Sequence, residues 1–178
     1  MSIPRLTEIF EAAKEVFTGC IRSISNEHAK IHDGKHFFYG DIVTLAQDAV
    51  LNICIQTPAS ETIHLNYNMG STLGTKIEVY EESDITYNGS DIVFENNNRL
   101  STNASPLTNS ETGSTINNVG TKLPSTIQLG SSTSPFQGLP GSGERKNELI
   151  LKRSTSYIIR ITSLNNSNVI SYFMDLYY

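Results

Sequence analysis

Three consecutive segments of the chain alternate apolar and polar residues, and this two-residue period constrains the fold more than any other feature. The alternating segments span residues 50 to 57, 62 to 69 and 75 to 81. Because successive side chains of a β-strand point to opposite faces, the period gives each strand one apolar and one polar face. Antiparallel sheets that pack on a core with one side have this pattern. The segments therefore predict antiparallel strands that share a core.

The last third of the chain carries the same signal. Residues 148 to 152, 156 to 163 and 169 to 178 alternate or are rich in Ile, Tyr, Phe and Leu, and residues 165 to 168 form a turn of Asn and Ser. Only 17% of the residues are charged, and the difference is filled by Ser, Thr, Asn and Gly, which favour turns over helix interiors. About eight strands with short turns predict an all-β fold, an antiparallel β-sandwich of jelly-roll type.

Residues 85 to 94 predict a tight hairpin. Asn88-Gly89 lies between two short apolar runs. This pair readily adopts the positive φ angles of a type I′ turn, whose twist matches that of the flanking strands. We therefore expect both residues to have positive φ. Asp33-Gly34 is a second turn signal, between residues 30 to 32 and an aromatic strand that begins at His36.

An amphipathic helix is predicted before the strands, over residues 4 to 18. Its apolar residues recur at three- and four-residue spacing. They are Leu6, Ile9, Phe10, Ala13, Val16 and Phe17. The period changes near Ala29, which divides the chain into an N-terminal helical arm (1–28) and a β-sandwich domain (29–178). This apolar stripe either packs on the chain's own sandwich or binds a partner chain. The change of period favours the partner, so these six are the candidate partner-binding residues.

A long polar excursion, residues 96 to 147, interrupts the β pattern. Large apolar residues are sparse there, and a loop of this length without secondary structure is unusual inside a compact domain. Two alternatives stay open: the segment is disordered, or it is extended and ordered against a neighbouring subunit. Residues 125 to 129 are expected to add an edge strand.

No pattern of residues predicts catalysis or a cofactor. His28, His32 and His36 would align as metal ligands on one helix, but the turn and strand expected around Gly34 would keep them apart, so no metal site is expected. The acidic run at residues 81 to 84 is interpreted as a solvated loop rather than a calcium site. Cys20 and Cys54 are expected to be reduced thiols. The sequence contains no nucleophile elbow, phosphate loop or Cys-x-x-Cys pair, so we expect a protein that is not an enzyme.

Charge and hydropathy exclude two further classes of partner. The net charge is −5 and the chain has no basic run, so no nucleic-acid partner is expected. No run approaches the ~20 apolar residues of a membrane span, and the first residues lack the apolar core of a signal peptide. We expect a soluble protein without membrane partners, made in the cytoplasm.

Several groups of residues, in order, resemble the pattern of a family of tailed-bacteriophage virion proteins. Ile31-His32-Asp33-Gly34-Lys35-His36-Phe37-Phe38 is similar to that family's opening, and the strand at residues 50 to 58 ends, like theirs, in Thr57-Pro58. The remaining groups resemble the family's next hairpin. They are Glu78-Val79-Tyr80-Glu81, Tyr87-Asn88-Gly89-Ser90 and Asn96-Asn97-Asn98-Arg99. The resemblance covers roughly residues 30 to 100 of the chain, and one departure is Glu82, where the family usually has Gly.

The resemblance implies a capsid decoration or cement protein, usually an oligomer, and it brings no catalytic residues. The expected partners are the major capsid protein and further copies of the chain in a homotrimer on the virion surface. The alternative is a host-surface binding module of a head or tail fibre, whose exposed tyrosines would recognise a glycan. A fibre would more often contain a repeated shaft, and no repeat is present.

Overall fold

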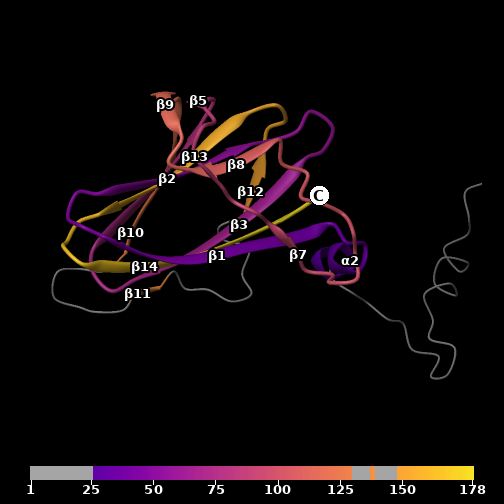
Figure 1. The fold of residues 1–178 in the computed structure, drawn as a ribbon, viewed down its shortest axis with the longest axis horizontal. Coiled ribbons are helices and arrows are strands. Elements are labelled where there is room, and N and C mark those ends of the chain that lie inside the picture. The colour runs from indigo at the N-terminus through magenta and orange to yellow at the C-terminus, as the bar shows by residue number, and fades with distance from the viewer. Residues whose placement is uncertain (1–25, 130–136, 139–147) are drawn as a thin grey trace, which may run out of the picture.

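Two antiparallel sheets face each other in the computed structural model, which describes residues 26–129, 137–138 and 148–178 (Figure 1). The first sheet contains β1 (His36–Leu45), β3 (Ile63–Ser71), β7 (Glu95–Asn96), β11 (Gln137–Gly138), β12 (Leu149–Leu151) and β14 (Asn168–Tyr177). The second sheet contains β2 (Val50–Gln56), β4 (Thr75–Glu81), β6 (Ser90–Asp91), β8 (Asn109–Thr112), β10 (Thr121–Leu129) and β13 (Ser156–Ser163). A separate two-stranded ribbon of β5 (Asp84–Thr86) and β9 (Thr115–Asn118) projects from the body.

The chain passes from one sheet to the other with nearly every long strand. The central order is β1-β14-β3-β12 in the first sheet and β2-β13-β4-β10 in the second. Strands that follow one another in sequence therefore lie in opposite sheets, as in a jelly roll. The first and last long strands pair along their full length, from His36 opposite Tyr177 to Leu45 opposite Asn168. This arrangement confirms the predicted antiparallel β-sandwich.

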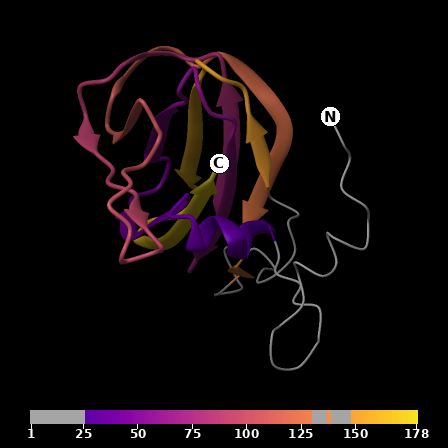
Figure 2. The same cartoon turned by 90° about the vertical axis from the view of Figure 1, so that its right-hand side faces the viewer.

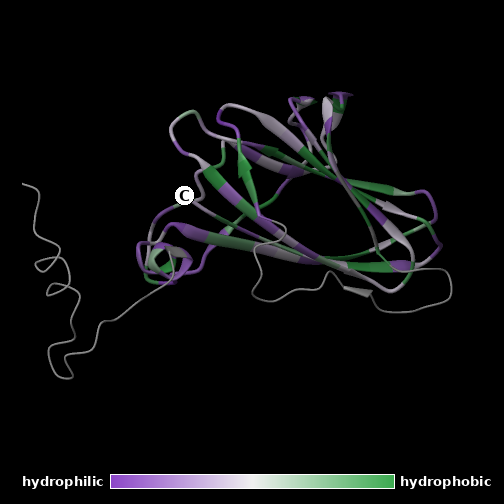
Figure 3. Ribbon diagram, turned by 180° about the vertical axis from the view of Figure 1, so that it is seen from behind, coloured by the Kyte–Doolittle hydropathy of each residue, from purple (hydrophilic) through white to green (hydrophobic). Residues whose placement is uncertain are grey.

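The core lies between the inner faces of the two sheets, and the two-residue period decides which side chains enter it. Along β3 the inward row is almost completely buried, whereas Asn68 on the opposite face is exposed. The inward residues of β3 are Ile63, Leu65, Tyr67 and Met69. Figure 3 shows the resulting alternation of hydrophobic and hydrophilic positions along the strands. The alternating segments identified in the sequence correspond to β2, β3, β4, β12, β13 and β14.

The predicted hairpin at residues 85 to 94 is wrong. Neither Asn88 nor Gly89 has a positive φ. The strands on the two sides of the pair bind other partners: β5 pairs with β9, and β6 pairs with β8. The Asn88 side chain contacts Thr115, accepting a hydrogen bond from its N–H (3.0 Å). Contacts distant in sequence thus replace the local turn.

The polar excursion is ordered on its own chain through Leu129, and residues 130–136 and 139–147 lie outside the described residues. β10 forms the edge of the second sheet beside β4, which confirms the edge strand expected at residues 125 to 129. Between β7 and β8 the chain is fixed by Asn96, whose amide donates hydrogen bonds to the carbonyls of Gly34 (2.9 Å) and Asn103 (3.2 Å). Within the described residues, the contacts that hold this segment come from its own chain.

A short helix, α2 (Asn26–His32), precedes β1, so the turn at Asp33-Gly34 joins a helix to a strand. Gly34 ends the helix with a φ of 66°, and Lys35 N–H donates to the carbonyl of Lys30 (2.8 Å). This is a helix-terminating motif that requires a left-handed residue, and glycine adopts that conformation without strain. α2 spans the boundary expected between residues 28 and 29, and it lies at one end of the sandwich (Figure 2). The six candidate partner-binding residues and Cys20 lie outside the described residues.

Candidate docking surface

The outer face of the first sheet presents apolar side chains where the alternation predicts polar ones. Ile42 of β1 is 68% exposed, and Phe173 of β14 is 43% exposed. Phe173 stacks on Phe38 with ring centroids 6.1 Å apart, and its ring lies against Gly40 in the neighbouring strand. The three aromatic and aliphatic side chains therefore form one surface across β1 and β14.

This surface surrounds an open hollow of about 660 Å³. The strand register explains the hollow. Ile42 of β1 lies opposite Ser171 of β14, which in turn lies opposite Gly70 of β3. The adjacent row places Gly40 opposite Phe173. Small residues thus lie beside large apolar ones on three neighbouring strands. We call this feature the outer-face hollow, with Gly40, Ile42, Gly70, Ser171 and Phe173 as its defining residues.

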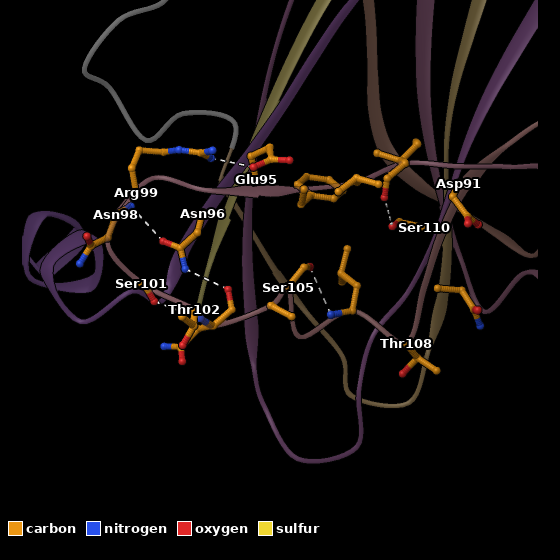
Figure 4. Close-up of a pocket in the computed structure, with 17 residues that line it drawn as sticks. Asp91, Glu95, Asn96, Asn98, Arg99, Ser101, Thr102, Ser105, Thr108 and Ser110 are labelled. Carbon is orange, nitrogen blue, oxygen red and sulfur yellow. Dashed lines mark hydrogen bonds and ion pairs between the residues drawn. The ribbon is translucent and has the colours of Figure 1, made fainter.

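A second hollow, of about 540 Å³, lies between residues 91–96 and the returning segment 98–110 (Figure 4). Its polar groups are largely engaged within the chain. The Asn96 Oδ1 atom accepts a hydrogen bond from the N–H of Asn98 (2.9 Å), and the Ser110 hydroxyl donates to the carbonyl of Ile92 (2.7 Å). Its aromatic lining is Phe94, which is only 5% exposed. This hollow therefore offers a glycan few free polar groups and no open ring to stack on.

The tyrosines do not form the exposed surface that a glycan-binding module was expected to use. All eight lie within the described residues, and none is exposed. Tyr172 illustrates the reason: its ring is buried in the sandwich, and burial raises the pKa of its hydroxyl well above the ordinary range. The sequence reveals how many tyrosines there are, but not that strands carry them inward.

The three regularly spaced histidines separate into a pair and a single residue. His28 and His32 lie one turn apart on α2, with their Nε2 atoms 3.0 Å apart, whereas His36 belongs to a different group of residues. His36 is the first residue of β1 and is nearly completely buried. Its Nε2 atom lies 3.5 Å from Glu27 Oε1 and 3.4 Å from Asp175 Oδ1. Sequence spacing did not reveal this group, because Asp175 belongs to the last strand.

The acidic run at residues 81 to 84 has a structural role. Lys152 Nζ lies 2.9 Å from a carboxylate oxygen of Glu81 and 2.7 Å from one of Glu82, and these hydrogen bonds raise the pKa of the lysine. The Ser83 hydroxyl donates to the carbonyl of Val119 (2.7 Å). The cluster is therefore neutralised by a lysine of the neighbouring strand connection rather than arranged around a cation.

Cys54 lies on the outer face of the second sheet and is nevertheless completely buried. The segment between β4 and β10 covers it, bringing Glu111 and Ser114 close to the thiol. Burial, followed by the negative charge of Glu111, raises the pKa of Cys54 to about 11. The thiol is therefore protonated and shielded, and the expectation of a reduced thiol is confirmed for Cys54.

The outer-face hollow was missed in the sequence although a signal was present. The outward-facing positions of β1 and β14, where the alternation predicts polar residues, carry Phe38, Ile42, Val169 and Phe173, whereas β3 has Asn66 and Asn68 at these positions.

No helix within the described residues is long and apolar enough to cross a membrane. Comparisons with family models, with curated proteins and with solved structures found no match to this chain.

Proposed function

We propose that this chain is an accessory protein of a tailed-bacteriophage capsid, which attaches to the major capsid shell as a homotrimer and stabilises the particle. The observation that carries the proposal is the outer-face hollow. Exposed apolar surface rimmed by polar residues is typical of protein–protein contact sites. The pattern of residues shared with virion decoration proteins supports the choice of a capsid as the setting.

We assign the outer-face hollow to the apolar stripe of residues 4 to 18 from a neighbouring copy. α2 lies on the same outer face of the first sheet, since its Glu27 contacts Asp175 and His36 there. The preceding residues therefore begin beside that face. A connection of eight residues between Phe17 and Asn26 spans at most about 25–30 Å, which sets how far from α2 the stripe can bind.

In this arrangement the apolar stripe of one copy and the outer-face hollow of the next copy bury each other. A helix of this length is marginal alone in water, so its apolar side chains need a surface to cover them. The hollow offers such a surface, with Ile42 and Phe173 as anchors and Gly40 as the floor against the Phe173 ring. Apolar anchors that fill pockets contribute most of the energy at protein interfaces.

The test uses the full chain and a double variant, Ile42→Ser with Phe173→Ser. Both residues are exposed, so the variant should fold normally. The control is Leu100→Ser, which removes an apolar side chain that is 95% exposed and lies away from the hollow. Light scattering should give a trimer for the wild type and the control, and a shift towards monomer for the double variant.

Attachment is measured by sedimentation of each protein with DNA-free capsids of the phage that encodes it. The wild type and the Leu100→Ser control should pellet with the capsids, and the double variant should bind much less. A monomeric wild type that does not pellet would refute the proposal. A double variant that trimerises and pellets like the wild type would show that the hollow is not the contact surface.

A further inference from the structure

We propose that Glu27, His36 and Asp175 bind a divalent first-row transition-metal ion, of which Zn²⁺ is the representative, and that this ion fixes α2 to the first sheet. The three residues come from α2, β1 and β14. Their ligand atoms all lie within 4.8 Å of one another. This inference stands on its own geometry and does not depend on a capsid function.

The spacing of the ligand atoms fits the ion. His36 Nε2 is 3.5 Å from Glu27 Oε1 and 3.4 Å from Asp175 Oδ1. In a tetrahedral zinc site, bonds of about 2.0–2.1 Å place neighbouring ligand atoms about 3.3–3.4 Å apart. These contacts are too long for hydrogen bonds of ordinary strength, which have a mode near 2.9 Å. The third separation, between the carboxylate oxygens of Glu27 and Asp175, is at most 4.8 Å, and the partly exposed Glu27 side chain can close it around an ion.

His36 is oriented as a metal ligand. Its side chain is 4% exposed, and its Nε2 atom makes no hydrogen bond within the described part of the chain although it points between two carboxylates. On the other side of the ring, Nδ1 lies 2.7 Å from the side-chain amide of Asn97. As the structure places it, the Asn97 Nδ2–H faces Nδ1; turning this amide by 180° on ion binding would bring its oxygen there, so that Nδ1–H donates to Asn97 and the Nε2 lone pair is free for the ion. Metal-binding histidines are usually held by such a second partner.

The remaining groups complete the site chemically. Asn66 donates a hydrogen bond to Asp175 Oδ1 (3.1 Å), which holds that carboxylate in place. Two carboxylates and one neutral imidazole carry a charge of −2, which a divalent cation neutralises. Glu27 is on the open side, with 41% of its side chain exposed, so water can occupy a fourth position. Imidazole together with carboxylate oxygens suits Zn²⁺ and its neighbours.

The experiment is calorimetric titration of Zn²⁺ into the full-length, chelator-treated chain, combined with thermal unfolding with and without the ion. We expect one tight site per chain and a rise in Tm. Glu27→Gln is the main ligand variant, because Glu27 is partly exposed and the fold should survive its change. It should weaken binding by about 100-fold or more and abolish the rise in Tm, since losing a ligand costs more than losing a second partner.

Two further variants make the test specific. His28→Ala with His32→Ala removes the exposed histidine pair on α2, which could itself bind Zn²⁺ with two nitrogens. This control should keep the tight site. Asn97→Ala removes no ligand and should weaken binding by about 10- to 100-fold.

The opposite results would overturn the proposal. Loss of the tight site in the histidine-pair variant, with retention in Glu27→Gln, would assign the metal to the exposed pair. Absence of binding and of any Tm change with Zn²⁺, Co²⁺ and Mn²⁺ at millimolar concentration would mean that the cluster is an ion-paired histidine between two carboxylates.

Discussion

Replacing Gly89 with alanine is expected to destabilise the protein because of a close contact, not because of backbone conformation. A Cβ atom at this position would lie 2.1 Å from the carbonyl oxygen of Thr112 and 2.7 Å from the nitrogen of Ser114. Both are backbone atoms, one at the end of β8 and one in the turn that follows it, so neither can rotate away. The turn would have to move by more than ~1 Å to restore ordinary van der Waals separation.

The magnitude follows from the hydrogen bonds that this movement breaks. The Gly89 N–H donates to the buried Glu111 carboxylate (2.8 Å), and the Ser114 hydroxyl donates to the same oxygen (2.7 Å). Each hydrogen bond to a charged group contributes about 1.5–3 kcal/mol, so losing one fully or both in part lowers the free energy of unfolding by about 3 kcal/mol.

Gly113→Ala supplies the matched comparison. Gly113 lies in the same turn and has a φ of +76°, but a Cβ there would contact nothing within 4 Å. Its substitution should cost about 1 kcal/mol through left-handed backbone strain alone. Urea denaturation of both variants measures the difference, provided that the m-values agree. If Gly89→Ala is no more destabilising than Gly113→Ala, the contact argument is wrong.

Three other predictions follow from the described contacts. Hydrogen bonding with Lys122 holds the pKa of Glu78 below its ordinary value of 4.5, so the stability that Glu78 contributes should be complete above about pH 4.5 and lost as the pH falls through its folded pKa. The difference in unfolding free energy between wild type and Glu78→Gln should therefore shrink in acid, and a difference that does not change with pH would contradict this. In a Cys20→Ser background, Cys54 should react with a thiol reagent at pH 8 only as fast as the protein unfolds, because burial raises its pKa to about 11; labelling within the mixing time would contradict its shielding. Deleting residues 1–19 should leave the melting temperature nearly unchanged but reduce trimer formation, and a truncated chain that melts much earlier would show that the stripe packs on its own sandwich.

The β-sandwich was predictable because its strands are defined by a short-range pattern. The alternation of residues 75 to 81 predicts a strand, and β4 has those bounds, with Ile77 and Val79 buried. The two-residue period predicts both the extended conformation of a segment and which of its two faces is buried. It does not state which strand lies beside which, because pairing depends on the path of the whole chain.

The hairpin predicted from Asn88-Gly89 is wrong, and the turn at Asp33-Gly34 follows a helix, because such residue pairs occur in more than one kind of local structure. Asp33-Gly34 ends a helix here, although the same pair often closes a hairpin. Asn88-Gly89 is bound by Thr115 and Glu111, which lie more than twenty residues further along the chain. These partners outweigh the conformational preference of the pair. Short motifs of this kind predict a change of direction better than they predict its type.

The outer-face hollow and the proposed metal site lie on the same face of the first sheet, and α2 contributes Glu27 to the metal site. α2 has seven residues, too few to be stable by its own hydrogen bonds, so its position depends on contacts such as that of Asn98 with the carbonyl of His32 (3.0 Å). A cation bound through Glu27 would fix the direction in which the preceding residues leave the sandwich, and therefore which copy their apolar stripe can reach.

Chelation should then weaken the trimer without unfolding the sandwich. The double variant of Ile42 and Phe173 should weaken the trimer while leaving zinc binding intact, because neither residue is one of the three ligands. If chelation leaves the trimer unchanged while zinc still binds, the ion stabilises α2 alone and the stripe reaches its neighbour by a path that α2 does not determine.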